Sequence, residues 1–272
     1  MSRIAQTVER AREAGNKLLI PYLVAGDPDL TSTLQLMHGL VGQGADIIEL
    51  GIPFSDPSSD GPVIQRGVER ALARGTCLQD ALDLVQQFRV KDAVTPIVLM
   101  GYLNPIEIMG YQQFVASACE TGVDGVLIVD MPPAESAELH DKLQAAGIDT
   151  IYLVAPTTSA TRASAITSLS TGYLYYVSLK GVTGAALTDY QSVGEKIAAL
   201  RGLTDLPIVI GFGIKDAESA QAMGKLADGI VIGSALVERI AKLPVHEPHT
   251  SADLQHCTAL IGMARDVINK IK

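Results

Sequence analysis

The segment from Glu49 to Pro62, ELGIPFSDPSSDGP, concentrates the residue types that proton-transfer chemistry requires. Glu49 stands inside the apolar run Asp-Ile-Ile-Glu-Leu, where burial of a carboxylate raises its pKa toward values useful for a general acid or base. Asp56 and Asp60 follow on a stretch whose prolines restrict the backbone. We therefore predict acid–base catalysis by Glu49, assisted by either aspartate. The alternatives are a structural ion pair at Glu49 and turn-stabilising roles for the aspartates.

Two glycine-containing segments, Gly211–Gly213 and Gly233–Ser234, each end a short apolar run and lead into a helical pattern. Glycines let an anion approach backbone N–H groups, and a helix N-terminus favours negative charge. The pattern predicts a phosphate-binding site. The first segment does not extend to GxGxxG, because Asp216 occupies the last position, so we do not expect a dinucleotide site.

Residues 178–192, SLKGVTGAALTDYQS, form a long segment without apolar periodicity. Gly181 and Gly184 offer flexible points in it. We expect a lid over residues 179–191 that closes over a bound substrate and excludes water, the alternative being an ordinary surface loop.

Composition excludes several classes of protein. The 272 residues include 21 basic and 30 acidic side chains, giving a net charge of −9, which disfavours binding to nucleic acid or anionic membranes. No apolar run is long enough to span a bilayer. The three cysteines lack CxxC spacing, and His246-x-x-His249 has no third ligand nearby, so neither a disulfide nor a metal site is expected. We expect a cytoplasmic protein.

Short apolar runs rich in β-branched residues recur between amphipathic stretches, and most lack alternation, as in strands covered on both faces. Strands repeated between helices predict either a (β/α)8 barrel, the TIM-barrel fold, or an open doubly wound sheet; the number of runs favours one barrel domain over residues 1–272. The eight runs are Leu18–Ala25, Asp46–Gly51, Ile97–Gly101, Gly125–Val129, Thr150–Ala155, Tyr173–Leu179, Pro207–Gly211 and Gly229–Gly233.

Two further helices are expected at the ends of the chain. Arg3–Ala14 and Ala252–Ile271 each carry an apolar face at helical spacing, and Ser251 is a candidate cap for the second. In a barrel the active site lies at the carboxyl ends of the strands, so the segments described above would meet there.

Together, these segments resemble the tryptophan synthase alpha chain family along essentially the whole chain. The resemblance rests on PYLVAGDPD, ADIIELGIPFSDPSSDGPVIQ, VLMGYLNPI, GVDGVLIVDMPPAE, the GVTG loop, GFGI and IGSALV, which occur in the family's order and spacing. It implies a lyase that cleaves indole-3-glycerol phosphate to indole and glyceraldehyde 3-phosphate in tryptophan biosynthesis. It also implies an α2β2 assembly with a beta chain, in which pyridoxal phosphate belongs to the partner and no cofactor to this chain.

By the same resemblance the catalytic residues are Glu49 and Asp60. Glu49 would transfer both protons of the reaction, and Asp60 would accept a hydrogen bond from the indole N–H. Tyr175 would orient one of the two carboxylates, and Thr183 would contact Asp60 when the lid closes. The substrate-binding residues implied are Tyr22, Met100, Leu127, Val129, Tyr175, Thr183, Gly184, Phe212, Gly213, Gly233 and Ser234.

The chain departs from the family pattern at Ser58 and Ser59, where an apolar residue and alanine are usual, and at Tyr22, where phenylalanine is common. Because the loop around Asp56 and Pro57 is where the family meets its beta chain, the two serines put the strength of that contact in doubt. The alternative functions are another phosphate-binding barrel lyase or isomerase, and a mainly allosteric partner subunit.

Overall fold

The strands close into a barrel. The computed structural model describes residues 1–177, 190–211, 213–244 and 248–271. Each strand pairs in parallel with the next, and β8 pairs with β1, which confirms the (β/α)8 TIM barrel and rules out the open sheet. The strands are β1 (Leu18–Val24), β2 (Ile48–Gly51), β3 (Ile97–Gly101), β4 (Gly125–Ile128), β5 (Asp149–Val154), β6 (Leu174–Val177), β7 (Ile208–Gly211) and β8 (Gly229–Ile232).

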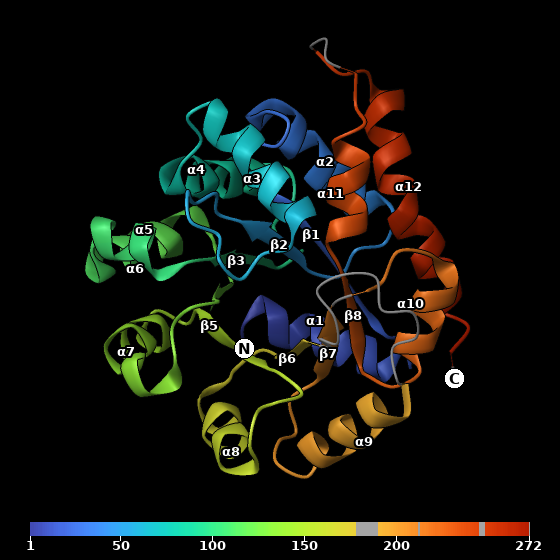
Figure 1. Cartoon of the computed structure of the whole chain (residues 1–272). Helices are drawn as coiled ribbons and strands as arrows, with labels where there is room; N and C mark the ends of the chain where they lie inside the picture. Colours follow the sequence, from blue (N-terminus) through green and yellow to red (C-terminus); the bar gives the residue numbers. More distant parts are fainter. Residues whose placement is uncertain (178–189, 212, 245–247, 272) are drawn as a thin grey trace.

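Helices surround the strands (Figure 1). At their starts, Asp29 Oδ1 accepts from Ser32 N at 2.7 Å to cap α2, and Pro62 begins α3 without losing a helical hydrogen bond. In chain order they are α1 (Arg3–Glu13), α2 (Leu30–Gly42), α3 (Pro62–Ala73), α4 (Leu78–Arg89), α5 (Leu103–Met109), α6 (Tyr111–Thr121), η1 (Pro133–Glu135), α7 (Ala137–Ala145), α8 (Ala160–Leu169), α9 (Tyr190–Arg201), α10 (Ala217–Gly224), α11 (Ser234–Ile240) and α12 (Ser251–Ile268).

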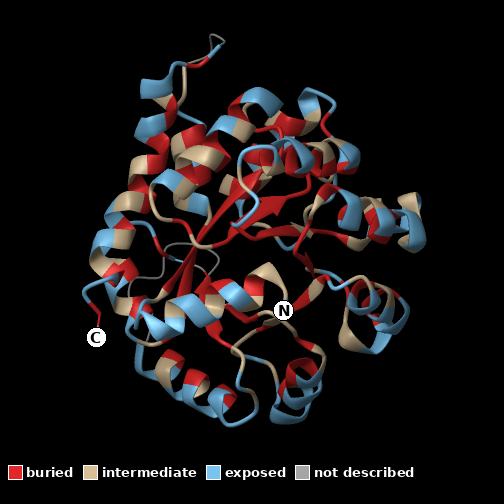
Figure 2. Cartoon of the chain, turned by 180° about the vertical axis from the view of Figure 1, so that it is seen from behind, coloured by how far each residue is buried: buried red, intermediate tan, exposed pale blue. Residues whose placement is uncertain are grey.

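Both faces of the strands are buried, which explains why their sequences lack alternation (Figure 2). In β2, Ile48 and Leu50 belong to the outer core between strands and helices. Ile47, just before the strand, belongs to the inner core of the barrel. Because side chains alternate along a strand, Glu49 points the same way as Ile47, into the barrel.

Helix α1 covers the amino-terminal end of the barrel. Ile4 is fully buried, Ser2 Oγ donates to Asp149 at 2.6 Å, and Arg3 forms an ion pair with Asp124 at 2.9 Å. The side chains at this end are therefore structural, and the opposite end is left for a site.

The second terminal helix differs slightly from the prediction. Helix α12 begins at Ser251, and its cap is Thr250, whose Oγ1 accepts from Asp253 N at 3.2 Å. Thr250 is preferred over the predicted Ser251 because Asp253 lies three residues after it and bonds back to Thr250 N, forming a capping box. None of the described helices is long and apolar enough to cross a membrane.

Candidate active site

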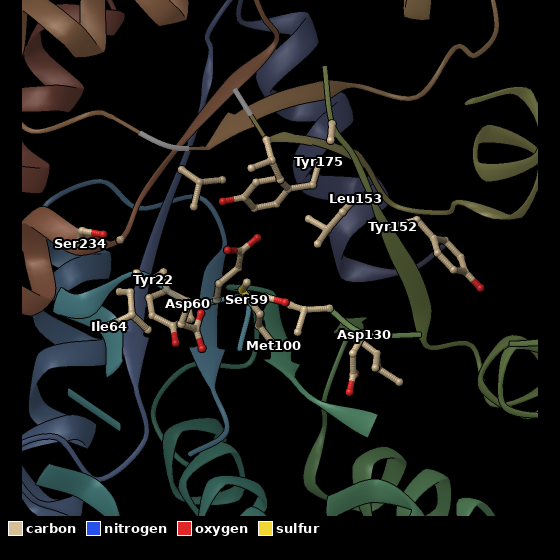
Figure 3. Close-up of a pocket in the computed structure, with 18 of the residues that line it drawn as sticks. Tyr22, Ser59, Asp60, Ile64, Met100, Asp130, Tyr152, Leu153, Tyr175 and Ser234 are labelled. Atoms are coloured by element: carbon tan, nitrogen blue, oxygen red, sulfur yellow. The ribbon is translucent and has the colours of Figure 1, made fainter. Parts of the chain in front are cut away.

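The carboxyl ends of the strands surround a cavity of about 850 Å³. Glu49 and Asp60 both line it, so the structure brings the two predicted carboxylates to one chamber. Figure 3 labels Asp60 among the lining residues. Glu49 comes from the interior face of β2, and Asp60 comes from the loop between β2 and α3.

Glu49 is fully buried, and one hydroxyl holds it in place. Tyr173 Oη donates to Glu49 Oε1 at 2.6 Å, whereas Oε2 has no hydrogen-bond partner among the described residues. Burial raises the pKa of Glu49 to about 7, and the Tyr173 hydrogen bond opposes that rise. A carboxyl group with this pKa can donate and accept a proton near neutral pH.

Asp60 is held by a second tyrosine. Tyr102 Oη donates to Asp60 Oδ2 at 3.1 Å and accepts from Ser59 N at 3.0 Å. Burial raises the pKa of Asp60, and the hydrogen bond from Tyr102 lowers it in part. Burial and the nearby Asp60 carboxylate raise the pKa of Tyr102 to about 12, so its hydroxyl remains a donor.

A side chain of α3 fixes the backbone of the same loop. Gln65 Nε2 donates to Asp60 O at 2.8 Å and to Pro57 O at 3.4 Å. The position of Asp60 therefore depends on its side-chain bond to Tyr102 and on its backbone bond to Gln65.

The positioning role expected of Tyr175 falls to other residues. In the described structure the hydroxyls that reach the carboxylates belong to Tyr173 and Tyr102. Tyr175 Oη instead lies against Gly211, where an added Cβ would approach within 1.8 Å of it. Tyr175 still lines the cavity, and its pKa is raised by burial and by Glu49.

Most predicted wall residues line the cavity, with one exception. Tyr22, Met100 and Val129 line it, but Leu127 does not. Leu127 is fully buried in the inner core and pairs in register with Met100. Its assignment as a substrate contact stays a prediction, because apolar residues that fill the barrel have the same sequence pattern as residues that line its mouth.

The predicted anion site lies on the β7 and β8 side of the cavity. Gly213, Gly233 and Ser234 line it, together with the cation Lys215. Gly213 has φ +78°, a left-handed conformation that favours glycine, and Gly233 caps α11. Thr183, Gly184, Phe212 and most of the predicted lid 179–191 lie outside the described residues.

The remaining predictions concern exposed or connecting segments. Asp56 is exposed and Pro57 partly exposed at the outer edge of the β2–α3 loop. No group of three or more His, Cys, Asp or Glu side chains in the described residues could hold a metal ion. His249 bonds Ser32 Oγ at 2.8 Å and Pro244 O at 3.0 Å, while His246 lies outside the described residues.

Sequence reasoning missed Tyr173 and Tyr102, although each had a signal. Tyr173 lies two residues before Tyr175, so both face the barrel interior. Tyr102 follows the strand Ile97–Gly101 at its carboxyl end, where side chains reach the cavity. Chain position alone could not show which carboxylate each hydroxyl would meet.

Comparison with known proteins gives one consistent family. The family described as Tryptophan synthase alpha chain matches residues 8–266. The tryptophan synthase alpha chain of Thioalkalivibrio sulfidiphilus is 52% identical over 269 residues, 99% of this chain and 100% of that protein. That of Methylococcus capsulatus is 53% identical over 266 residues, 98% and 100% of the two chains. The crystal structure of tryptophan synthase subunit alpha from Legionella pneumophila superposes with a TM-score of 0.91, at 42% identity over 100% of both chains.

Proposed function

The chain belongs to the tryptophan synthase alpha chain family, and from that premise we propose that it cleaves indole-3-glycerol phosphate to indole and glyceraldehyde 3-phosphate by a retro-aldol reaction. It acts as the alpha subunit of tryptophan synthase, in tryptophan biosynthesis. The observation that carries the proposal is a carboxyl group that lines the cavity, is fully buried, has a pKa of about 7, and has one oxygen without a partner among the described residues.

Glu49 performs both proton transfers. As an acid it protonates the ring carbon that bears the glycerol chain, which converts the indole ring into a cation. As the resulting carboxylate it removes the proton of the adjacent glycerol hydroxyl. The carbon–carbon bond then breaks, its electron pair restores the aromatic ring, and the former alcohol leaves as the aldehyde. Glu49 ends the cycle protonated, so no other proton donor is consumed.

Asp60 stabilises the charge that develops on the ring. As a carboxylate it accepts a hydrogen bond from the ring N–H, an interaction that strengthens as positive charge develops there. The Tyr102 hydroxyl keeps Asp60 oriented and favours its ionised form, because it donates to Oδ2.

The remaining cavity residues bind the rest of the substrate. Backbone at Gly213 and Gly233, the Ser234 side chain and the Lys215 cation suit the phosphate, and Gly184 and Phe212 complete this site by resemblance. Tyr22, Met100 and Val129 pack against the indole ring. Tyr175 lines the same cavity, and we assign it to the substrate by resemblance. Thr183 and the lid 179–191 close over the substrate.

We assign the chain a tryptophan synthase beta chain as partner, in an α2β2 assembly, with Asp56 and Pro57 in the contact. Both belong to an exposed loop that also carries Asp60, so the partner would act on the catalytic loop directly.

Pyridoxal phosphate is placed in the partner, because Glu49 and Asp60 supply the acid, base and counter-charge that the alpha reaction needs. Residues 1–272 are proposed as one domain, and three free cysteines fit a cytoplasmic location.

The test is release of indole from indole-3-glycerol phosphate by the purified chain, alone and with a beta chain. We expect indole from the wild type, more with the beta chain, and none detectable from Glu49→Gln or Asp60→Asn. Binding of the substrate without any release would retain the anion site and refute the lyase. Release by both variants at the wild-type rate would refute the roles of the carboxylates.

A further inference from the structure

Tyr22 lies across one wall of the cavity, between the anion side and the carboxylates (Figure 3). At one end, a Cβ added to Gly233 would meet the Tyr22 ring at 3.4 Å. At the other end, a Cβ added to Gly51 would meet Tyr22 Oη at 2.3 Å. A glycine at position 51 is therefore required for the ring to occupy this place, whereas the approach at Gly233 is ordinary van der Waals packing.

Among the described residues, the Tyr22 hydroxyl has no hydrogen-bond partner. The side chain is 7% exposed and lines the cavity. The Tyr22 O–H is therefore available to water, or to a bound group that offers an acceptor.

The Asp60 carboxylate lines the same cavity as this hydroxyl (Figure 3). Burial raises the pKa of Tyr22 well above its ordinary value, and Asp60 raises it further, ahead of Glu49, Tyr102 and Tyr175. Tyr22 therefore remains a neutral donor at every pH at which an enzyme works, beside an acceptor carboxylate on the same wall. The contrast is Tyr152, another tyrosine of the lining, whose hydroxyl already donates to Ser136 Oγ at 2.7 Å.

We propose that the Tyr22 hydroxyl and the Asp60 carboxylate form a donor–acceptor pair that reads the N–H edge of the bound ring and so sets the ring specificity of the site. The inference rests on the proposed function, in which Asp60 accepts the ring N–H. Beside that N–H, on the six-membered ring of indole, lies carbon 7. The hydroxyl faces this position, where it hydrogen-bonds an acceptor atom and excludes a larger substituent.

Two indole analogues separate these effects. In 7-azaindole the carbon beside the N–H is replaced by a nitrogen that accepts a hydrogen bond, and in 7-methylindole that carbon carries a methyl group. We would measure kcat/KM for condensation of each ring, and of indole, with glyceraldehyde 3-phosphate. For each variant we divide the kcat/KM of an analogue by that of indole. Comparing this ratio between variants cancels the differences in intrinsic reactivity among the rings.

Tyr22→Phe is expected to change the two ratios in opposite directions. The 7-azaindole ratio falls about 2- to 10-fold, because a neutral hydrogen bond is lost. The 7-methylindole ratio rises about 10-fold, because space for one methyl group opens. Tyr152→Phe is the matched control, and both ratios are expected to stay at the wild-type values.

Ratios that do not move in Tyr22→Phe, or that move in the same direction, would overturn the inference while turnover of indole still supports the lyase. Wild type that condenses no indole would refute the proposed function. In that case the affinities of the three rings for wild type and Tyr22→Phe, measured by calorimetry, decide the inference by the same two ratios.

Discussion

Glu49 and Asp60 line one cavity, but two different kinds of structure hold them. Glu49 belongs to β2, which pairs with β1 and β3, and its side chain enters a closed apolar barrel. Asp60 belongs to a loop whose residues Ser55, Asp56 and Ser58 are exposed. One carboxylate is fixed by the fold, and the other by two side chains that bond to a loop.

This difference matches the two chemical tasks. An acid that also acts as a base needs a pKa near neutrality, which requires removal from water, and only the barrel interior provides that. A carboxylate that stabilises a cation must stay ionised, and partial exposure with a donor hydroxyl favours that form. Under the proposed contact at Asp56 and Pro57, the partner would act on the loop that carries Asp60 and not on the strand that carries Glu49.

Changing side-chain length gives the largest expected contrast. Glu49→Asp retracts the carboxyl group by about one bond length from a strand that cannot follow, so kcat is expected to fall about 100-fold or more. Asp60→Glu lengthens a side chain on a loop that can adjust, and about a 10-fold loss is expected. Steady-state indole release checks both. Equal losses in the two variants would contradict the contrast between strand and loop.

Glu49→Gln is expected to stabilise the folded chain although it abolishes activity. Glu49 has a pKa of about 7 in the folded chain and an ordinary value of 4.5, so between these values the folded state binds more protons and wild-type stability falls as pH rises. Glu49→Gln has no ionisable group at this position, so its stability does not fall with pH for this reason.

At pH 8 its free energy of unfolding is therefore expected to exceed that of wild type by up to about 3 kcal/mol, at about 1.4 kcal/mol for each pH unit between the two pKa values. Below pH 4.5 the gain disappears. Urea unfolding at pH 4 and 8 measures it, with Asp60→Asn as the comparison, for which a smaller gain is expected. A gain at Glu49 that does not depend on pH would exclude this cause.

The pH profile of kcat/KM is expected to separate the two tyrosines. The reaction needs protonated Glu49 and ionised Asp60, so activity falls above about pH 7 and again at acidic pH. Tyr173→Phe removes a donor that favours ionised Glu49, so the alkaline limb moves up by about 0.5 to 1 pH unit. Tyr102→Phe moves the acidic limb up by a similar amount, because Asp60 then ionises at higher pH.

Each of these variants should leave the other limb in place. A shift of both limbs in either one would mean that the two carboxylates titrate as a coupled pair.

The backbone support of the loop gives the smallest expected effect. Gln65→Ala removes the donor to Asp60 O, and kcat/KM is expected to fall about 5-fold, the equivalent of one neutral hydrogen bond. The pH profile keeps both midpoints, because the Asp60 carboxylate retains Tyr102. A moved acidic limb would show that Gln65 acts on the charge of Asp60 rather than on its position.

Much of this architecture could be predicted from residues alone. The apolar runs in which polar residues do not alternate predicted a parallel barrel, since strands buried on both faces need apolar residues at every position. Glu49 was recognisable because a carboxylate within such a run must change its pKa or find a partner. Gly213 and Gly233 were recognisable because a glycine at the end of a strand lets an anion approach the backbone N–H groups closely.

Contacts between distant parts of the chain could not be predicted in the same way. Tyr173 meets Glu49 across 124 residues, and Tyr102 meets Asp60 across 42, and both pairings depend on strand order and barrel register. Thr250 was missed as a cap because Ser251 is equally suited to that role by type, and only the bond to Asp253 decides between them.

The ionisation of Glu49 tests the central claim most directly. Carboxyl infrared difference spectra of wild type and Glu49→Gln, recorded from pH 4 to 9, isolate the signal of this one group. The account predicts a protonated carboxyl band that persists above pH 6 and titrates near pH 7. A Glu49 that is fully ionised at pH 5 would contradict it, because the group could then not serve as the acid that begins the reaction.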